Sequence, residues 1–200
     1  MPTKFIIVLL AGATAIAAPA HASEIPDGLA PPSCDYGTVH PDAASELSEF
    51  AFLIGDFTIR ARPWTQDGWG PFVEQFRARL TGRYVLGGRA IQDDWFDTDP
   101  GINPDTTMGL TTRMWDPAAG EWKIAWMNTP ATTLTDLRAS MEDGVLTMTT
   151  VYPAQPNYDA YFGHDGPDTW TRTAFKTEAD GTRTPIWQAV ATRIPCPGSD

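Results

Sequence analysis

Apolar and polar residues alternate with a period of two over most of the chain after Gly55. At the start of this pattern Phe57, Ile59 and Ala61 are separated by polar residues. This alternation is typical of β-strands with one buried and one polar face, and the abundant Thr, Val, Ile, Trp and Tyr favour strands as well. The pattern predicts strands at residues 57–62, 72–84, 89–95, 108–116, 121–127, 134–141, 145–152, 169–176 and 185–194.

The predicted strands follow one another through short connections with turn chemistry. Residues 116–120 read Asp-Pro-Ala-Ala-Gly, and residues 142–144 and 179–181 end in Asp-Gly. A long series of sequential strands avoids open edges by closing on itself. We therefore predict an all-β fold, an antiparallel up-and-down barrel of about 8–10 strands that is lipocalin-like. A β-sandwich is the alternative, because periodicity does not show closure.

One segment before the strands has helical spacing. Leu47, Phe50 and Leu53 recur at intervals of three, and Asp42 is placed to cap the first turn. The spacing predicts one short helix over residues 42–53. Residues 23–41 are rich in Pro, Gly and Ser and have no periodicity, which predicts an extended N-terminal arm.

The first 22 residues have the pattern of a secretory signal peptide. Lys4 precedes an apolar run at residues 5–18, and Ala20-His21-Ala22 offers the small residues that a signal peptidase requires. The apolar run is too short to span a membrane. We expect cleavage after Ala22 and a periplasmic or secreted protein, with a single domain at residues 42–200.

Net charge and cysteine content narrow the function further. The formal net charge of -11 disfavours nucleic acids and anionic membranes as partners. The two cysteines, Cys34 and Cys196, lie near opposite ends of the mature chain. In an exported protein they predict one disulfide bond, which by chain entropy would stabilise the fold by roughly 4–5 kcal/mol. The alternative is a reactive thiol or a metal pair, but neither cysteine lies in a CxxC motif.

The strand at residues 121–127 suggests a binding pocket. Trp122, Trp126 and Asn128 share one face of it, opposite Lys123. If Lys123 points to solvent, this face points into the barrel and forms an aromatic pocket with a polar end, with Arg113 as a further candidate. The alternative is that the tryptophans only fill the core.

Residues 153–167 show neither a strand nor a helix pattern. This segment contains Tyr161 and His164, and an ordered loop of such length is often functional. We predict a loop that covers the mouth of the barrel, with Tyr161 in contact with the ligand. The alternative is a surface loop whose aromatic residues pack down.

No residue is assigned a catalytic role, but three are candidates. Adjacent Asp93 and Asp94 point to opposite faces of a strand, and a bulge at Gly87-Gly88 would reverse which one faces inward. An inward carboxylate could serve as an acid or base, and His164 is the third candidate. The alternative is an Asp–Arg pair within the barrel wall.

The chain lacks the common motifs of metal and nucleophile chemistry. Acidic residues recur at residues 97–105, but Pro100 and Pro104 interrupt the spacing of a calcium loop and no Glu closes it. G-x-S-x-G and H-E-x-x-H are both absent from the sequence. We therefore expect no bound metal.

Three short motifs resemble those of DUF1579-type lipocalin-like barrels. Residues 52–57 (Phe-Leu-Ile-Gly-Asp-Phe) resemble the L-x-G-x-W opening, residues 84–92 contain the Leu-Gly-Gly-Arg strand, and residues 109–126 resemble the G-x-x-x-Y-D…W hairpin. Phe57 stands where that group has Trp, and Trp115 where it has Tyr. The resemblance, over residues 47–128, implies a calycin-like barrel and no catalytic residues.

A more distant resemblance, to nitrobindin-like barrels, concerns the opening motif alone. Those proteins hold haem through a late His. The mature chain has only His40, in the arm, and His164, in a Gly/Pro-rich segment. We therefore expect no cofactor.

Three hypotheses follow for the function. The first is an exported barrel that binds a small apolar or aromatic molecule. The second is an isomerase, cyclase or lyase that uses a cavity Asp or His for proton transfer on a small hydrophobic substrate. The third is a protein-interaction module. An aromatic cavity favours binding, and a packed barrel without a cavity favours the interaction module. The sequence leaves the oligomeric state open, and it predicts neither nucleic-acid binding nor membrane insertion.

Overall fold

The computed structural model describes residue 32 and residues 34–74, 76–97, 109–129, 133–155 and 158–198. The predicted signal peptide, about half of the predicted arm (residues 23–31 and 33) and residues 98–105 of the acidic segment at 97–105 lie outside the described residues. Within the described ranges no helix is long and apolar enough to cross a membrane.

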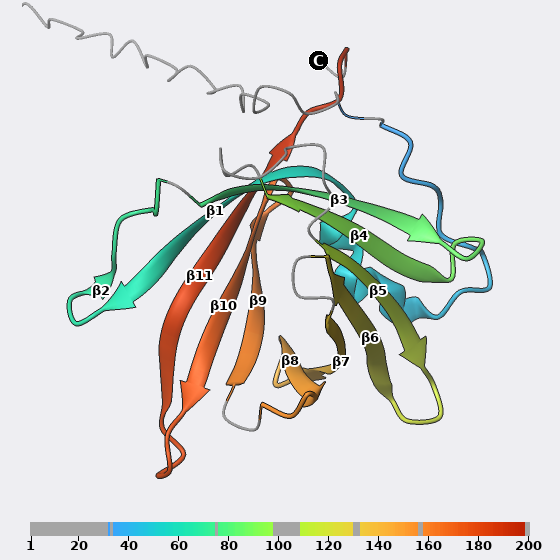
Figure 1. Cartoon of the computed structure of the whole chain (residues 1–200). Helices are drawn as coiled ribbons and strands as arrows, with labels where there is room; N and C mark the ends of the chain where they lie inside the picture. The colour runs from blue at the N-terminus through green and yellow to red at the C-terminus, as the bar shows by residue number, and fades with distance from the viewer. Residues whose placement is uncertain are drawn as a thin grey trace, which may run out of the picture.

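Ten antiparallel strands close into a barrel, which confirms the predicted fold class and excludes the sandwich (Figure 1). Each strand pairs with the next, and β11 returns to β1 with a register that runs from Asp56 opposite Ile194 to Pro63 opposite Trp187. The short β2 (Gly68–Trp69) pairs only with the end of β1. The barrel strands are β1 (Gly55–Thr65), β3 (Arg77–Val85), β4 (Ala90–Asp97), β5 (Gly109–Asp116), β6 (Glu121–Asn128), β7 (Thr133–Glu142), β8 (Val145–Tyr152), β9 (Tyr158–Gly166), β10 (Thr169–Thr177) and β11 (Arg183–Ile194).

The predicted short helix is present, but as a 3-10 helix, η1 (Ser45–Leu53). Its three predicted apolar residues, Leu47, Phe50 and Leu53, are all buried at one end of the barrel. The expectation that Asp42 caps it is wrong. Residues 41–43 form a turn held by the bond from the Ala43 amide to the His40 carbonyl, so the helix begins only after an extended Ala44.

The predicted long loop at residues 153–167 is also wrong, because β9 occupies most of it. Sequence periodicity missed β9 because Tyr161 and Phe162 are adjacent aromatic residues on opposite faces. Phe162 is buried in the core, whereas Tyr161 packs against Phe175 on the outer face, with ring centroids 4.7 Å apart. Alternation of apolar and polar residues fails where both faces of a strand are covered.

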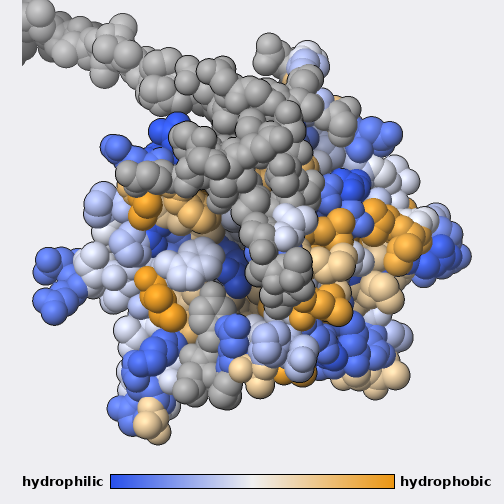
Figure 2. Space-filling model, viewed as in Figure 1, coloured by the Kyte–Doolittle hydropathy of each residue, from blue (hydrophilic) through white to orange (hydrophobic). Residues whose placement is uncertain are grey.

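Helix η1 closes one end of the barrel beside β3 and β4 (Figure 1). The contact is close because β3 has Gly82 there. A methyl group on Gly82 would lie 1.9 Å from the carbonyl oxygen of Leu53, so no other residue fits without moving the helix. Helix η1 therefore closes this end of the barrel, which we call its floor. Elsewhere on the surface, Figure 2 shows hydrophilic side chains at the projecting turns and scattered hydrophobic patches between them.

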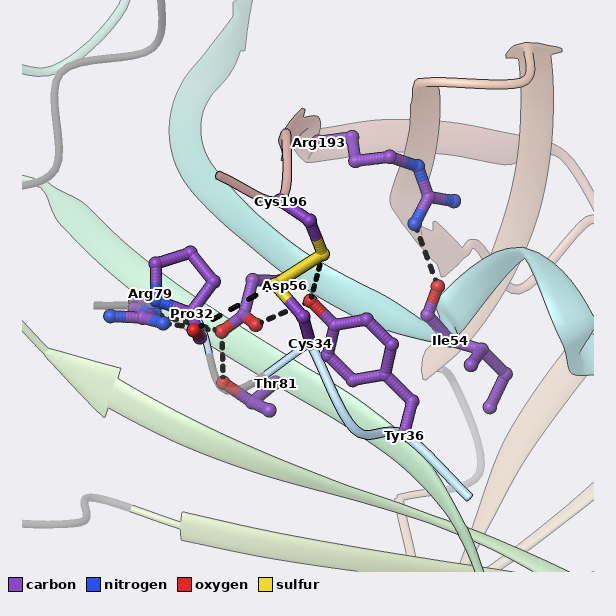
Figure 3. Close-up of a disulfide and its surroundings, with 9 residues drawn as sticks. All are labelled: Pro32, Cys34, Tyr36, Ile54, Asp56, Arg79, Thr81, Arg193 and Cys196. Carbon is purple, nitrogen blue, oxygen red and sulfur yellow. Dashed lines mark hydrogen bonds and ion pairs between the residues drawn. A yellow bond between two sulfur atoms is a disulfide. The ribbon is translucent and has the colours of Figure 1, made fainter. Parts of the chain in front are cut away.

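The predicted disulfide joins Cys34 to Cys196, with Cα atoms 5.8 Å apart. It holds the N-terminal arm against the outer face of the barrel (Figure 3). The arm also bonds to β3 through the Tyr84 amide and the Tyr36 carbonyl, 2.8 Å apart. The disulfide bond and this backbone hydrogen bond therefore both hold the arm on the barrel.

Beneath the arm lies a polar cluster centred on Asp56, which is fully buried although it points outward from β1. Its carboxylate accepts hydrogen bonds from Arg79 Nε (3.0 Å), Thr81 Oγ1 (2.7 Å) and the Tyr36 hydroxyl (2.8 Å). Burial, together with the bond to the Asp56 carboxylate, raises the pKa of Tyr36 to about 12. This cluster fastens the arm to the barrel.

Candidate functional site

The barrel contains a cavity of about 350 Å³ that is partly open to solvent. That volume falls within the range of about 300–1,000 Å³ that is usual for small-molecule sites. The apolar part of its wall consists of Leu53, Phe76, Leu80, Trp95, Trp126, Leu137, Met148, Phe162, Trp170, Trp187 and Ala189. The wall is thus mainly aromatic and aliphatic.

Aromatic rings pack against η1 below the cavity. Phe50 meets Trp122 edge to face at a centroid distance of 4.9 Å, and Phe162 at 5.6 Å. Such arrangements are favourable beyond the area they bury. Together with Leu53, which lines the cavity, these rings close this end of it.

A buried ion pair interrupts the apolar wall. Asp93 on β4 and Arg113 on β5 are diagonal neighbours, since Asp93 lies opposite Thr111. The Arg113 guanidinium binds the Asp93 carboxylate and lies over the Phe50 ring, 5.1 Å from its centroid. Only 2% of Asp93 and 5% of Arg113 is exposed. Because Arg113 Nε is buried without a hydrogen-bond partner, one donor in this wall is unused.

A second arginine, Arg172 on β10, also lines the cavity. Its guanidinium lies over the Trp187 ring, 5.1 Å from the centroid. Within the described parts of the chain no carboxylate forms an ion pair with it. Since Arg113 is neutralised by Asp93, the described wall carries one excess positive charge.

The Trp126 indole is held in the wall by a glycine on the neighbouring strand. A methyl group on Gly109 would lie 1.9 Å from Trp126 Cη2. The ring therefore occupies the space that a side chain at position 109 would need, and Gly109 determines where the indole lies.

Replacing Gly109 with alanine is expected to lower the free energy of unfolding by about 1–3 kcal/mol, the usual cost of overpacking. Urea denaturation measures the change. Combining Gly109→Ala with Trp126→Leu gives the methyl group room, so the two changes should cost less together than separately. Strict additivity would show that the two residues do not interact.

Of the five pocket residues predicted from the sequence, two line the cavity and three lie elsewhere. Trp126 and Arg113 line the cavity. Trp122 is fully buried under η1, where its Nε1 donates to Glu49 Oε2 at 2.8 Å, and it is not part of the wall. Asn128, at the end of β6, is half-buried and also outside the wall. Tyr161 lies on the outer face of β9, with the Arg183 guanidinium 5.0 Å from its ring centroid.

The three candidate acid–base residues are likewise separated. Asp93 faces the cavity, because the β3–β4 register continues without a bulge from Val85 opposite Ala90. Asp94 points outward and binds Arg83. His164 is exposed, and its ring lies 5.9 Å from that of Phe52, outside the cavity wall.

Sequence reasoning missed Trp95, Arg172 and Trp187. Parity groups Trp95 with Asp93 and Arg172 with Trp170, but the sequence did not show that these faces point inward. Alternation identifies the two faces of a strand, but not which inward residues border an empty space rather than the packed core.

No cluster of three or more His, Cys, Asp or Glu side chains suited to a metal ion occurs among the described residues. His40 lies on the outside of the barrel, where its Nε2 is 3.0 Å from Arg89 Nη2. Neither His40 nor His164 lines the cavity, so neither is placed to hold a haem there.

No family model and no curated protein matches the chain. Among solved structures, the S-type phycobiliprotein lyase CPES from Guillardia theta covers 75% of this chain and 93% of its own, with 10% identity and a TM-score of 0.48. Rv2717c from M. tuberculosis covers 76% of this chain and 99% of its own, with 15% identity and a TM-score of 0.41. At such identities these likenesses say nothing about what this chain binds.

Proposed function

We propose that this protein binds a small apolar or aromatic molecule inside the barrel. The observation that carries the proposal is the partly open cavity of about 350 Å³ with Trp95, Trp126 and Trp187 in its wall. A core evolved only for stability is close-packed, whereas an aromatic cavity with a few polar groups is the usual form of a ligand site. The cavity also favours ligand binding over the interaction-module hypothesis.

Saturable binding of a neutral fluorescent probe tests this proposal. N-phenyl-1-naphthylamine should bind at one site per chain, and Trp126→Ala should weaken it about tenfold, because a buried aromatic contact contributes about 1.5–3 kcal/mol. Trp64→Ala is the matched control, since Trp64 is 39% exposed on the outside of the barrel. The titration follows the rise in probe fluorescence.

Either of two results would contradict the proposal. The first is probe binding that does not saturate. The second is an equal effect of Trp126→Ala and Trp64→Ala, which would place the probe on the surface.

An enzyme is the second candidate function, and one observation favours it: the Asp93 carboxylate lies in the cavity wall. It is the only one of the three candidate acid–base residues that does so. A substrate that displaced Arg113 from Asp93 would free the carboxylate for proton transfer. An isomerase, cyclase or lyase would then be inactivated by Asp93→Asn while still binding its substrate.

We further propose that the chain is exported and related to the DUF1579-type barrels. The Cys34–Cys196 disulfide supports export, because disulfides persist in oxidising compartments. Mass measurement of the protein recovered from the periplasm or medium would test cleavage after Ala22. An uncleaved chain in the cytoplasm would overturn the proposal.

A further inference from the structure

We infer, on the basis of the proposed function, that the ligand is an organic anion: an apolar or aromatic body with one negatively charged group that Arg172 binds. The inference concerns the chemical class of the ligand. It follows from the charges and the hydrogen-bond donors that face the cavity.

The charge balance of the wall favours an anion. Among the residues that the structure describes, Asp93, Arg113 and Arg172 are the charged ones that line the cavity. The salt bridge between Asp93 and Arg113 leaves Arg172 as the uncompensated charge among them. A charge that faces an apolar cavity is poorly solvated, so an opposite charge on the ligand would be bound strongly. A cation in the same cavity would be repelled.

The hydrogen-bond donors that line the cavity also favour an anionic ligand. An arginine side chain donates hydrogen bonds and accepts none. Arg113, whose Nε is buried without a partner, lines the cavity from β5. Arg172 faces it from β10, on the opposite side of the ten-stranded barrel. A ligand with acceptor atoms at both ends would accept hydrogen bonds from both arginines.

Arg172 is also held ready for a planar anionic group. Its guanidinium stacks over Trp187, which limits the conformations of a long side chain before the ligand arrives. A preorganised guanidinium binds a carboxylate with two parallel hydrogen bonds at little further entropic cost.

Three compounds of similar size and shape test the inference. They are 2-naphthoate, 2-naphthamide and 2-naphthylmethylammonium, which are negative, neutral and positive. Binding of each compound to the wild-type protein is measured by its displacement of N-phenyl-1-naphthylamine. We expect 2-naphthoate to bind at least about tenfold more tightly than 2-naphthamide, and the cation to bind most weakly, since hydrogen bonds to charged groups are the strong ones.

Variants then assign the charge effect to one side chain. Arg172→Gln should remove the preference for 2-naphthoate over 2-naphthamide, and Arg172→Lys should keep most of it. Lys176→Gln, an exposed residue of the same strand, removes the same charge and should change nothing. Circular dichroism of each variant shows whether it is folded.

The outcomes separate the inference from the proposed function. If all three compounds bind equally to the wild type, the cavity binds ligands but the inference is wrong. If the preference for the anion persists in folded Arg172→Gln, Arg172 is not its source and the inference is wrong. If neither the fluorescent probe nor any of the three compounds binds at a single site, the proposed function fails and the inference with it.

Discussion

Replacing Arg113 with leucine is expected to lower the free energy of unfolding by about 3–5 kcal/mol. The variant leaves Asp93, only 2% exposed, as a buried carboxylate without its ion-pair partner. It also removes the guanidinium from above Phe50. Urea denaturation of the single variant against the wild type measures the loss.

A double variant shows what the ion pair is for. When both partners of a buried pair become apolar, stability is often restored or exceeded, because no desolvated charge remains. Asp93→Leu combined with Arg113→Leu should therefore be clearly more stable than Arg113→Leu alone. If the double variant is as stable as the wild type but binds 2-naphthoate poorly, the pair serves the cavity rather than the fold. A single variant that loses less than about 1 kcal/mol would contradict the expectation that the pair is tightly buried.

Replacing Asp56 with alanine is expected to lower the free energy of unfolding by about 3–5 kcal/mol. Here too the variant removes one partner of a buried ion pair, in the polar cluster beneath the N-terminal arm. The change removes the Asp56 carboxylate from the buried Arg79 guanidinium, and it deprives the Tyr36 and Thr81 hydroxyls of this acceptor. Asp94→Ala is the matched control on the neighbouring outer face. Its ion pair with Arg83, in which the side chains are 16% and 34% exposed, should contribute about 1 kcal/mol or less.

Asp56→Ala should also lower the pKa of Tyr36. Burial and the bond to Asp56 raise the pKa of Tyr36 from 10.0 to about 12. An unfolded tyrosine ionises first, so the wild type loses stability as the pH rises from 10 to about 12. Without Asp56 the pKa of Tyr36 falls and this loss becomes smaller. Tyrosinate absorbance measures the change, and an unaltered titration curve in Asp56→Ala would contradict the role of Asp56.

Much of the fold could be predicted from the sequence because each strand has two chemically different faces. The run at residues 145–152 has the bounds that the structure gives to β8. Strand β9 does not follow this pattern, because the aromatic Tyr161 faces outward, where Phe175 and Arg183 cover it. Asp42 does not cap η1 either, because a turn from His40 determines where the helix begins.

The site was less predictable because it depends on contacts between distant segments. The sequence did not decide between Asp93 and Asp94, and only the unbroken register of β3 and β4 places Asp93 inward. The floor of the cavity depends on the contact of Leu53 with Gly82, nearly thirty positions further along the chain. Parity places Trp122 and Trp126 on one face, but η1 covers only Trp122 and leaves Trp126 in the cavity wall.

The pairing of β11 with β1 has a consequence for how the chain is made. The first strand to leave the ribosome keeps an open edge until the last strand has been synthesised, so the barrel closes late and through contacts of high sequence separation. A premature stop before Arg183 would remove β11 and Cys196 together. Such a product would expose the edges of β1 and β10 at the same time, and exposed edges pair readily with other chains. The segment from Arg183 onward therefore separates a closed barrel from a sheet with two exposed edges.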